Sequence, residues 1–140
     1  MNAGELSISV RLRHPVMEPE AITSAMGVEP GVAHPVGGKR MTPIGRELSG
    51  HYSETYWAFG LEDRSDADLD DAIANANVWV QRRESFVVDF VRSGGSLEYY
   101  VTIESTDRLA FVFGHDRLAE CVRFQAAIAV EVLRPPSVEV

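Results

Sequence analysis

An alternating hydrophobic pattern lies near the N-terminus and ends at His14-Pro15. Because successive side chains of a strand point to opposite faces, this alternation predicts a half-buried strand. Proline has no N–H for a sheet, so Pro15 ends it. The apolar positions of this strand are Leu6, Ile8, Val10 and Leu12, which alternate with Ser7, Ser9, Arg11 and Arg13.

A short helix is predicted directly after this strand. Proline is tolerated in the first turn of a helix and carboxylates favour its positive end, which suits Glu18, Pro19 and Glu20. Gly27 supplies a left-handed residue at the end of the helix, and Pro30 prevents its continuation.

The same segment carries a resemblance to a known family. The matching letters are Ile8-Ser9-Val10-Arg11-Leu12-Arg13, Glu18-Pro19-Glu20-Ala21-Ile22-Thr23 and Met26-Gly27-Val28-Glu29-Pro30. They resemble the bacterial domain-of-unknown-function family 4279, whose members are small and have a single domain. A later tryptophan strand, a helix with an acidic start and a final strand fit the same order. The chain departs from the family pattern over Val32–Gly38. The resemblance implies no established activity, so it assigns no catalytic residue.

Four further segments have the pattern of strands. Tyr52–Leu61 is rich in aromatic residues, and Gly60 predicts a bulge within it. Leu97–Ile103 alternates strictly, and after a turn Leu109–Phe113 is predicted to return antiparallel to it. Ala127–Leu133 is the last predicted strand. The apolar strand faces predict a core led by Ile8, Val10, Trp57, Phe59, Val101, Ile103, Phe111 and Val130.

A helical pattern runs from Leu69 to Val91, which is about 35–40 Å at a rise of about 1.5 Å per residue and is long for a domain of this size. Ser65 or Asp66 is predicted to cap it. Asn75 and Asn77 are weak helix formers, so a break into two helices is predicted there. A further helix is predicted just before the last strand.

These elements predict an α+β fold, a mainly antiparallel sheet with helices packed on one face. From Tyr52 onward the order matches a ferredoxin-like split β-α-β-β-α-β core, to which the first strand and helix form an added N-terminal β-α unit.

The 140 residues predict a single domain over 1–140. Glycine and proline density predicts a flexible loop over 31–50, either a solvated excursion or an anion- or partner-binding flap. Residues 135–140 are predicted to form a loose C-terminal tail.

Net charge and apolar runs restrict the environment and the partners. The formal net charge of −8 argues against nucleic acid or an anionic membrane as the main partner and permits a basic protein partner. No signal peptide and no apolar run of about 18 residues is visible, which predicts a cytoplasmic protein with no membrane contact. Cys121 is the single cysteine and is predicted to be a small buried hydrophobic residue.

Candidate chemistry is sparse. The four histidines, His14, His34, His51 and His115, have no metal-ligand spacing, and no hydrolase or nucleotide-binding motif is present. No catalytic residue, metal or cofactor is therefore predicted. The alternative is a small hydrolase or metal-dependent enzyme, if folding joins His14 and His115, which each follow a predicted strand.

The leading prediction is a non-enzymatic binding or protein-interaction module, such as an immunity or regulatory protein. Self-association as a homodimer is predicted through the open sheet face or a sheet edge. That face is predicted to carry Arg11, Arg13, Tyr56, Tyr100 and Thr102. The predicted binding residues are His34, Lys39, Arg40, Arg46, His51, Tyr56 and Tyr100.

Overall fold

A computed structural model describes residues 5–134 of the chain. Its elements confirm the predicted α+β class. In chain order they are β1 (Glu5–His14), α1 (Pro19–Met26), β2 (Val32–His34), β3 (Lys39–Met41), β4 (Glu47–His51), β5 (Thr55–Arg64), α2 (Leu69–Gln81), α3 (Glu84–Arg92), β6 (Ser96–Glu104), α4 (His115–Arg123) and β7 (Ala126–Leu133). The tail predicted over residues 135–140 lies outside the described residues.

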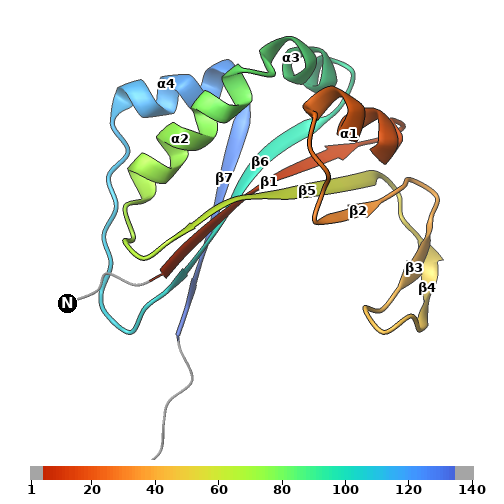
Figure 1. The fold of residues 1–140 in the computed structure, drawn as a ribbon, viewed down its shortest axis with the longest axis horizontal. Coiled ribbons are helices and arrows are strands. Elements are labelled where there is room, and N and C mark those ends of the chain that lie inside the picture. Colours follow the sequence, from red (N-terminus) through yellow and green to blue (C-terminus); the bar gives the residue numbers. More distant parts are fainter. Residues whose placement is uncertain (1–4, 135–140) are drawn as a thin grey trace, which may run out of the picture.

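The first strand, β1, occupies the middle of a five-stranded sheet with the order β2-β5-β1-β6-β7 (Figure 1). Strand β1 is antiparallel to both β5 and β6, and β2 is antiparallel to β5. The last pair, β6 and β7, is parallel. The sheet is therefore mainly antiparallel, as predicted.

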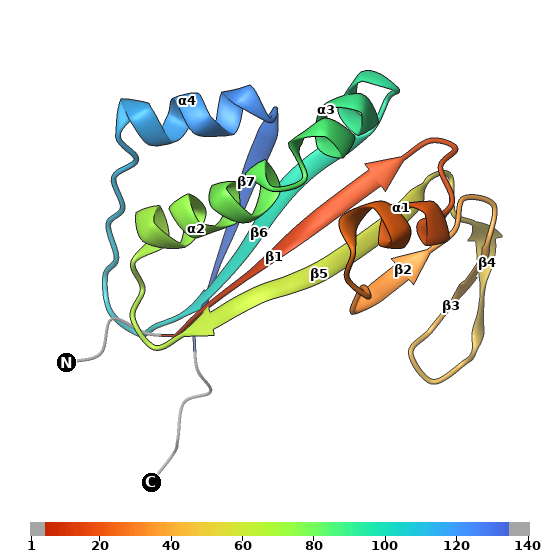
Figure 2. The same ribbon diagram turned by 45° about the horizontal axis from the view of Figure 1, so that its top comes forward.

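All four helices lie on one side of this sheet (Figures 1 and 2). From one edge to the other, α1 contacts β5, α2 contacts β1, α3 contacts β6 and α4 contacts β7. The side chains between the two layers form the core. Of the predicted core residues, Ile8, Val10, Trp57, Val101 and Ile103 are buried, whereas Phe59 and Phe111 are half-buried.

The prediction for Val130 is wrong, because its side chain is 42% exposed. It points to the helix side of the sheet, opposite buried Val101 of β6. Strand β7 is an edge strand, however, and its outer side has no neighbour in the described part of the chain. An inward-pointing residue of an edge strand is covered from one side only.

The bulge predicted at Gly60 is confirmed, and it changes which side chains of β5 face the helices. Ser9 pairs with Gly60 and Ile8 pairs with Glu62, so Leu61 is the extra residue. After the bulge Glu62 and Arg64 point to the helix side. Arg64 is accommodated there by two carboxylates at the start of α2: its Nε lies 2.8 Å from Asp66 and its Nη2 lies 2.9 Å from Asp71.

The predicted positions of the helix cap and of the helix break are both wrong. The side chain of Asp68, not of Ser65 or Asp66, accepts a hydrogen bond from the N–H of Asp71. The break between α2 and α3 falls after Gln81 rather than at the asparagines, since the buried Asn77 keeps its side chain hydrogen-bonded.

Arg83, which lies at the break between α2 and α3, donates hydrogen bonds to both α1 and α2. Its Nε donates to the carbonyl of Met26 at 2.7 Å, and its Nη1 donates to the carbonyl of Trp79 at 3.0 Å. These bonds satisfy the last carbonyls of α1 and α2 at the point where the chain turns. Tertiary hydrogen bonds, rather than weak helix formers, accompany the break.

Residues 105–114 contain no regular element, so the prediction of a return strand over Leu109–Phe113 is wrong. The ferredoxin-like split arrangement used that strand and is not confirmed. Instead, β5 and β6 are parallel to each other and β1 lies between them, with α2 and α3 in the crossover. A second crossover, through α4, places β7 beside β6.

The segment predicted as a loop over 31–50 contains three strands. Strand β2 pairs with β5, and β3 pairs with β4 in a separate hairpin that extends beyond the β2 edge (Figure 1). Nearly every residue of the hairpin is exposed. The predicted solvated excursion is therefore an ordered hairpin, and its flexibility stays a prediction.

Candidate functional site

The face of the sheet opposite the helices carries a set of aromatic and charged side chains that touch one another. Register pairing places Tyr56 beside Arg13, and Glu98 beside Arg11, on this face. We call the set the open-face row. It consists of Tyr52, His34, Tyr56, Arg13, Glu98, Arg11, Tyr100 and Glu131, in order across the sheet from the β2 side to β7.

Three aromatic rings form one end of the row. His34 of β2 pairs with Tyr56 of β5, and their ring centroids lie 6.1 Å apart. The other face of His34 stacks on Tyr52, with centroids 4.4 Å apart and ring planes 12° from parallel. The backbone of Tyr52 exchanges hydrogen bonds with Gly37 and Gly38 at the base of the hairpin. The aromatic end of the row therefore anchors the β3–β4 hairpin to the sheet.

Two arginines and a shared glutamate form the middle of the row. The Arg13 guanidinium lies 5.1 Å from the centroid of the Tyr56 ring. Glu98 accepts a hydrogen bond from Arg11 at 3.4 Å and lies 3.9 Å from Nη1 of Arg13. One carboxylate thus lies near two guanidinium groups, and each guanidinium also lies over a tyrosine ring.

Tyr100 forms the other end of the row. Arg11 lies over its ring, 3.6 Å from the centroid, and its hydroxyl donates to Glu131 of β7 at 2.6 Å. The hydrogen bond to Glu131 raises the pKa of Tyr100, so the phenol stays protonated. Every member of the row contacts a neighbour in it, so each side chain is restrained by the others.

The structure divides the predicted binding residues into two groups. His34, Tyr56 and Tyr100 come together in the open-face row. The other four lie on the hairpin instead: Lys39, Arg40, Arg46 and His51. Nζ of Lys39 pairs with Glu47 at 2.9 Å within that hairpin.

Sequence reasoning did not name three members of the row, Tyr52, Glu98 and Glu131. Tyr52 was treated as the start of a strand, whereas β5 begins at Thr55. The stacking of Tyr52 on His34 depends on the β2–β5 pairing, for which the sequence carries only a weak signal. Glu131 reaches Tyr100 because β7 is parallel to β6, a pairing that was not predicted.

His14 is buried and has a structural role. Its Nδ1 accepts hydrogen bonds from the N–H groups of Val16 and Met17 at 3.1 and 3.0 Å. With Nδ1 occupied as an acceptor, Nε2 carries the proton and faces Ser93 Oγ at 2.8 Å. Burial lowers the pKa of His14, which keeps the ring neutral. These bonds close the turn between β1 and α1 against the end of α3.

The structure does not bring His14 and His115 together. His14 ends β1, while His115 begins α4 at the opposite end of the sheet (Figure 2). His115 is exposed and its Nε2 lies 3.1 Å from Asp116. Within residues 5–134, no three His, Cys, Asp or Glu side chains are grouped in a way that could hold a metal ion.

A buried polar network links β6 to α2 and α4. The hydroxyl of Tyr99 donates to Asn77 at 2.7 Å, and the amide of Asn77 donates to Glu120 at 3.2 Å. The thiol of Cys121 lies 3.6 Å from the same amide. Burial is the main cause that raises the pKa values of Tyr99 and Cys121. Cys121 is thus a buried thiol, as predicted, and a poor nucleophile.

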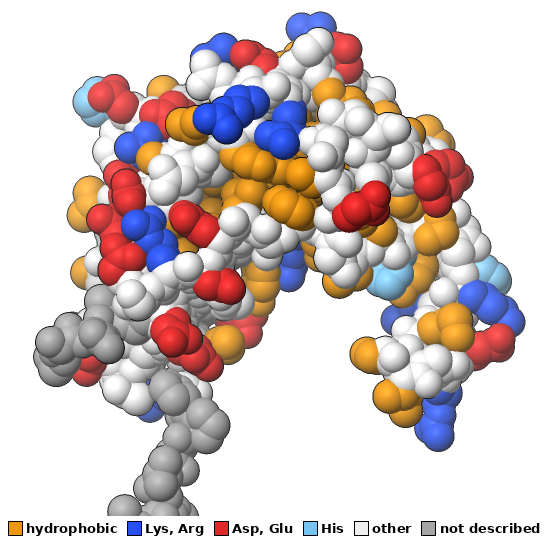
Figure 3. All heavy atoms as spheres, in the orientation of Figure 1, with side chains coloured by type: hydrophobic (Ala, Val, Ile, Leu, Met, Phe, Trp, Pro, Cys, Tyr) orange, Lys and Arg blue, Asp and Glu red, His pale blue; other side chains and the backbone are white. Residues whose placement is uncertain are grey.

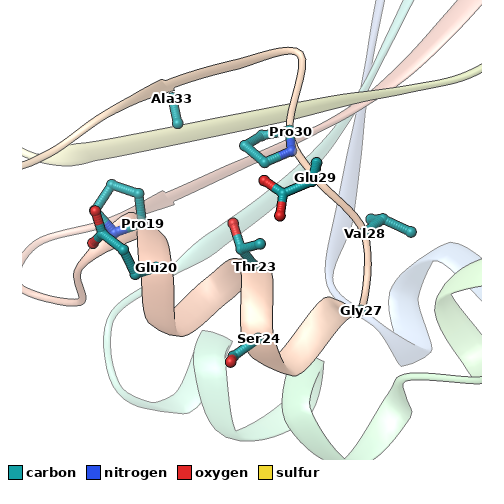
Figure 4. Close-up of a pocket in the computed structure, with 9 residues that line it drawn as sticks. All are labelled: Pro19, Glu20, Thr23, Ser24, Gly27, Val28, Glu29, Pro30 and Ala33. Atoms are coloured by element: carbon teal, nitrogen blue, oxygen red, sulfur yellow. The ribbon is translucent and has the colours of Figure 1, made fainter.

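A pocket of about 630 Å³ lies between α1 and the segment that leads into β2 (Figure 4). Glu29 points into it toward Thr23, whose hydroxyl accepts a hydrogen bond from Nε1 of Trp57 at 3.0 Å. No described ion pair involves Glu20 or Glu29. The pocket is lined by Pro19, Glu20, Thr23, Ser24, Gly27, Val28, Glu29, Pro30 and Ala33. Sequence reasoning did not find it, because its walls meet only in the fold.

Hydrophobic side chains also gather in the hollow between α1 and α2, over β5 (Figure 3). Trp79 of α2 stacks on Phe59 of β5, with centroids 5.6 Å apart and planes 12° from parallel. Arg83 covers the other side of Trp79 at 3.9 Å. The two rings and the arginine bridge the space between the helices, so this cluster supports the fold.

Comparison of the chain with models of protein families, with curated proteins and with solved structures found no match. The resemblance to the domain-of-unknown-function family 4279 therefore stays a prediction. No helix in the described part of the chain is long and apolar enough to cross a bilayer.

Proposed function

We propose that the chain is a cytoplasmic, non-enzymatic protein-interaction module that binds a protein partner on its open sheet face. The observation that carries this proposal is the open-face row. Tyrosine and arginine are enriched at the centres of protein interfaces, and here each of two arginines lies over a tyrosine ring. An immunity or regulatory protein, and a member of the family that the first third resembles, would both fit this proposal.

The row is suited to binding because its side chains are already restrained. Association normally costs free energy for each side chain that becomes ordered. Arg11 and Arg13 are held between Glu98 and two tyrosine rings, so they lose little further freedom on contact. Their side chains are 25% and 32% exposed, which leaves one surface of each available.

Photo-crosslinking in the cells that make the protein tests this proposal. p-Benzoylphenylalanine replaces Tyr56 or Tyr100, one at a time, and the adducts are identified by mass spectrometry. We expect both positions to crosslink to the same partner protein. Arg11→Glu, introduced beside the probe at Tyr56, should abolish the adduct because it reverses a charge within the row.

The control places the same probe at Val78 of α2, which is 51% exposed on the helix side. Equal yields of the same adduct from Val78 and from the two tyrosines would contradict open-face binding. The absence of any protein adduct at both tyrosine positions would contradict it as well.

The pocket under α1 supports a second binding role, capture of a basic side chain. No lysine or arginine is among the lining residues, which include the acidic Glu20 and Glu29. Pro19, Pro30 and Ala33 supply apolar walls for an alkyl stem.

Agmatine, an alkylguanidinium, should shift the NMR signals of the pocket residues, and Glu29→Gln should weaken this effect. Glu104→Gln, at an exposed position at the end of β6, serves as the matched control. If agmatine shifts the NMR signals of Glu29→Gln as much as those of the wild type, capture of a basic side chain by this pocket is excluded.

Homodimer formation is part of the same proposal. An interaction module can use one surface for its partner and another for itself. The open face and the free sheet edge are separate surfaces, so the two activities need not compete.

A further inference from the structure

Strand β7 leaves one edge of the sheet open along its whole length. Among the described residues it pairs only with β6, over the eight residues Ala126–Leu133. It contains no proline and a single charged residue, Glu131. Natural proteins usually protect an exposed edge with charges, proline, a bulge or a covering element. Within residues 5–134, β7 has one charged residue, no proline, no bulge and no second neighbouring strand.

The exposed side chains of this edge are apolar. Val130 and Val132 are 42% and 51% exposed, although their neighbours in β6, Val101 and Ile103, are fully buried. Leu133 is 37% exposed. The edge therefore presents both free backbone groups and uncovered aliphatic surface.

Helix α4 adds a second apolar strip above the same edge. Leu118 and Val122 are four residues apart, so they lie on one side of the helix, and they are 47% and 73% exposed. The residues of α4 that bind α2 and α3 are Arg117, Glu120 and Arg123. At 100° per residue, these three lie on the opposite side of the helix.

The position of α4 fixes where this strip points. Helix α2 contacts the central strand β1, whereas α4 contacts the edge strand β7. The side of α4 that faces away from α2 thus overhangs the free edge. Leu118 and Val122 continue the exposed surface of Val130 and Val132 from the strand to the helix layer.

We propose that a second copy of the chain pairs with this edge, β7 against β7 in antiparallel orientation. The proposal deepens the proposed function, since it names the surface used for self-association. A two-fold axis perpendicular to the sheet relates the copies, so the two sheets become one and the two α4 helices meet above the junction. This symmetric arrangement satisfies the backbone groups of both edges at once.

Charge and side-chain pairing favour a second copy with the axis at Val130. In this register Val130 faces its own counterpart, Val132 faces Ile128, and Glu131 faces Ala129. An axis at Glu131 would place two carboxylates directly opposite each other, which is unfavourable. An axis at Ala129 would leave Leu133 without a partner. The edge is thus complementary to itself and brings no like charges together.

Joining the sheets in this way also joins the two open faces. Because the axis is perpendicular to the sheet, both open-face rows lie on the same side of the dimer. Tyr100 and Glu131, at the β7 end of each row, come closest to the junction. A partner would then meet one surface twice as wide.

Sedimentation equilibrium over a wide concentration range tests the association itself. The full chain should approach twice the 15.5 kDa mass of the monomer as concentration rises. Val122→Glu, which buries a carboxylate beside its symmetry mate, should raise the dimer dissociation constant by about tenfold or more, equivalent to about 1.4 kcal/mol. Val78→Glu, on α2 and also at an exposed valine, should leave it unchanged.

A monomer mass at every concentration would overturn the proposal, as would equal weakening by the two variants. A disulfide test addresses the register independently of any destabilising charge. Val130→Cys should form an intermolecular disulfide under mild oxidation, because directly opposed Cβ atoms lie about 4.5–5.5 Å apart and a small shift of the strands brings them to the roughly 3.5–4.5 Å of a disulfide. Val78→Cys should not, and equal crosslinking of both would exclude the Val130 axis.

The two proposals fail separately. If the edge does not pair, Val122→Glu and the wild type have the same mass while open-face crosslinking persists. If the open face binds no partner, the crosslinks at Tyr56 and Tyr100 are absent while the dimer and its Val130→Cys disulfide remain.

Discussion

Tyr99 and Tyr100 are adjacent in β6, and each represents one face of the sheet. Tyr99 is fully buried under the helices, and its hydroxyl reaches Asn77 at 2.7 Å. Tyr100 lies on the open face, where its hydroxyl reaches Glu131 at 2.6 Å. The two hydrogen bonds are similar in length, but water can replace only the second. The buried hydrogen bond therefore contributes more to the stability of the fold.

The same contrast holds for the two faces as a whole. On the helix side, buried aliphatic and aromatic side chains stabilise the fold, so a substitution there lowers the free energy of unfolding strongly. The open side is held by ion pairs and cation–π contacts that solvent screens, so these contacts organise a surface more than they stabilise the fold. Four predictions test this division, from the largest expected effect to the smallest.

Trp57→Ala should lower the free energy of unfolding by about 3–5 kcal/mol, because it removes a fully buried indole and leaves a cavity. It also leaves the hydroxyl of Thr23 without its donor. Urea denaturation measures the change. Tyr56→Ala, one residue earlier and on the open face, is the control and should cost less. Equal losses would show that the two faces contribute alike.

Tyr99→Phe should lower the free energy of unfolding by about 1–3 kcal/mol, because Asn77 keeps a buried amide oxygen without a donor. The matched variant Tyr100→Phe should leave the denaturation midpoint within error, since water can bond to the freed Glu131. Should Tyr100→Phe prove the more destabilising of the two, the assignment of the faces would be wrong.

Stability should depend on pH through His14. Its folded pKa lies below the ordinary value of 6.5, so its contribution is fully present above pH 6.5. As pH falls from 6.5 toward the lowered pKa, the unfolded chain binds the proton and the folded chain does not, so stability falls. Urea midpoints measured across this window should decline for the wild type. His14→Gln should be less stable overall and show a shallower decline; an identical slope would exclude His14 as the cause.

Arg13→Gln should change the free energy of unfolding by less than about 1 kcal/mol, because its ion pairs are solvent-accessible. High salt should reduce this small difference further. A loss that is larger and independent of salt would indicate that the open face contributes to the core. Denaturation at low and high salt distinguishes the outcomes.

The sequence alone predicted a strand and its buried side correctly where that strand has one covered face and two neighbouring strands. The alternation of β1 and β6 predicted both strands and the buried side of each. Leu109–Phe113 is apolar throughout and packs Leu109, Phe111 and Phe113 against the core, but it is not a strand, because β7 already occupies the free side of β6. An apolar segment indicates that part of it is covered, and it does not indicate whether a position in the sheet remains.

The helix break and the candidate sites depended on contacts between distant residues. Asn77 is a weak helix former, yet Tyr99 and Glu120 satisfy its side chain within α2. Arg83 makes the hydrogen bonds at the break that the helical pattern could not show. The open-face row was only partly predicted, because His34 meets Tyr56 through a three-residue strand in a segment rich in glycine and proline.

The central position of β1 has a consequence for the order of folding. Strand β1 leaves the ribosome well before both of its neighbours in the sheet, since Leu6 pairs with Arg64 and Leu12 pairs with Leu97. Until residue 104 has been made, β1 lacks one of its two partners. Such distant pairings slow folding because long loops must close first. A nascent chain therefore carries the apolar side chains of β1 unpaired until both partners have been made, and early binding by a chaperone would benefit it more than a protein with local pairings.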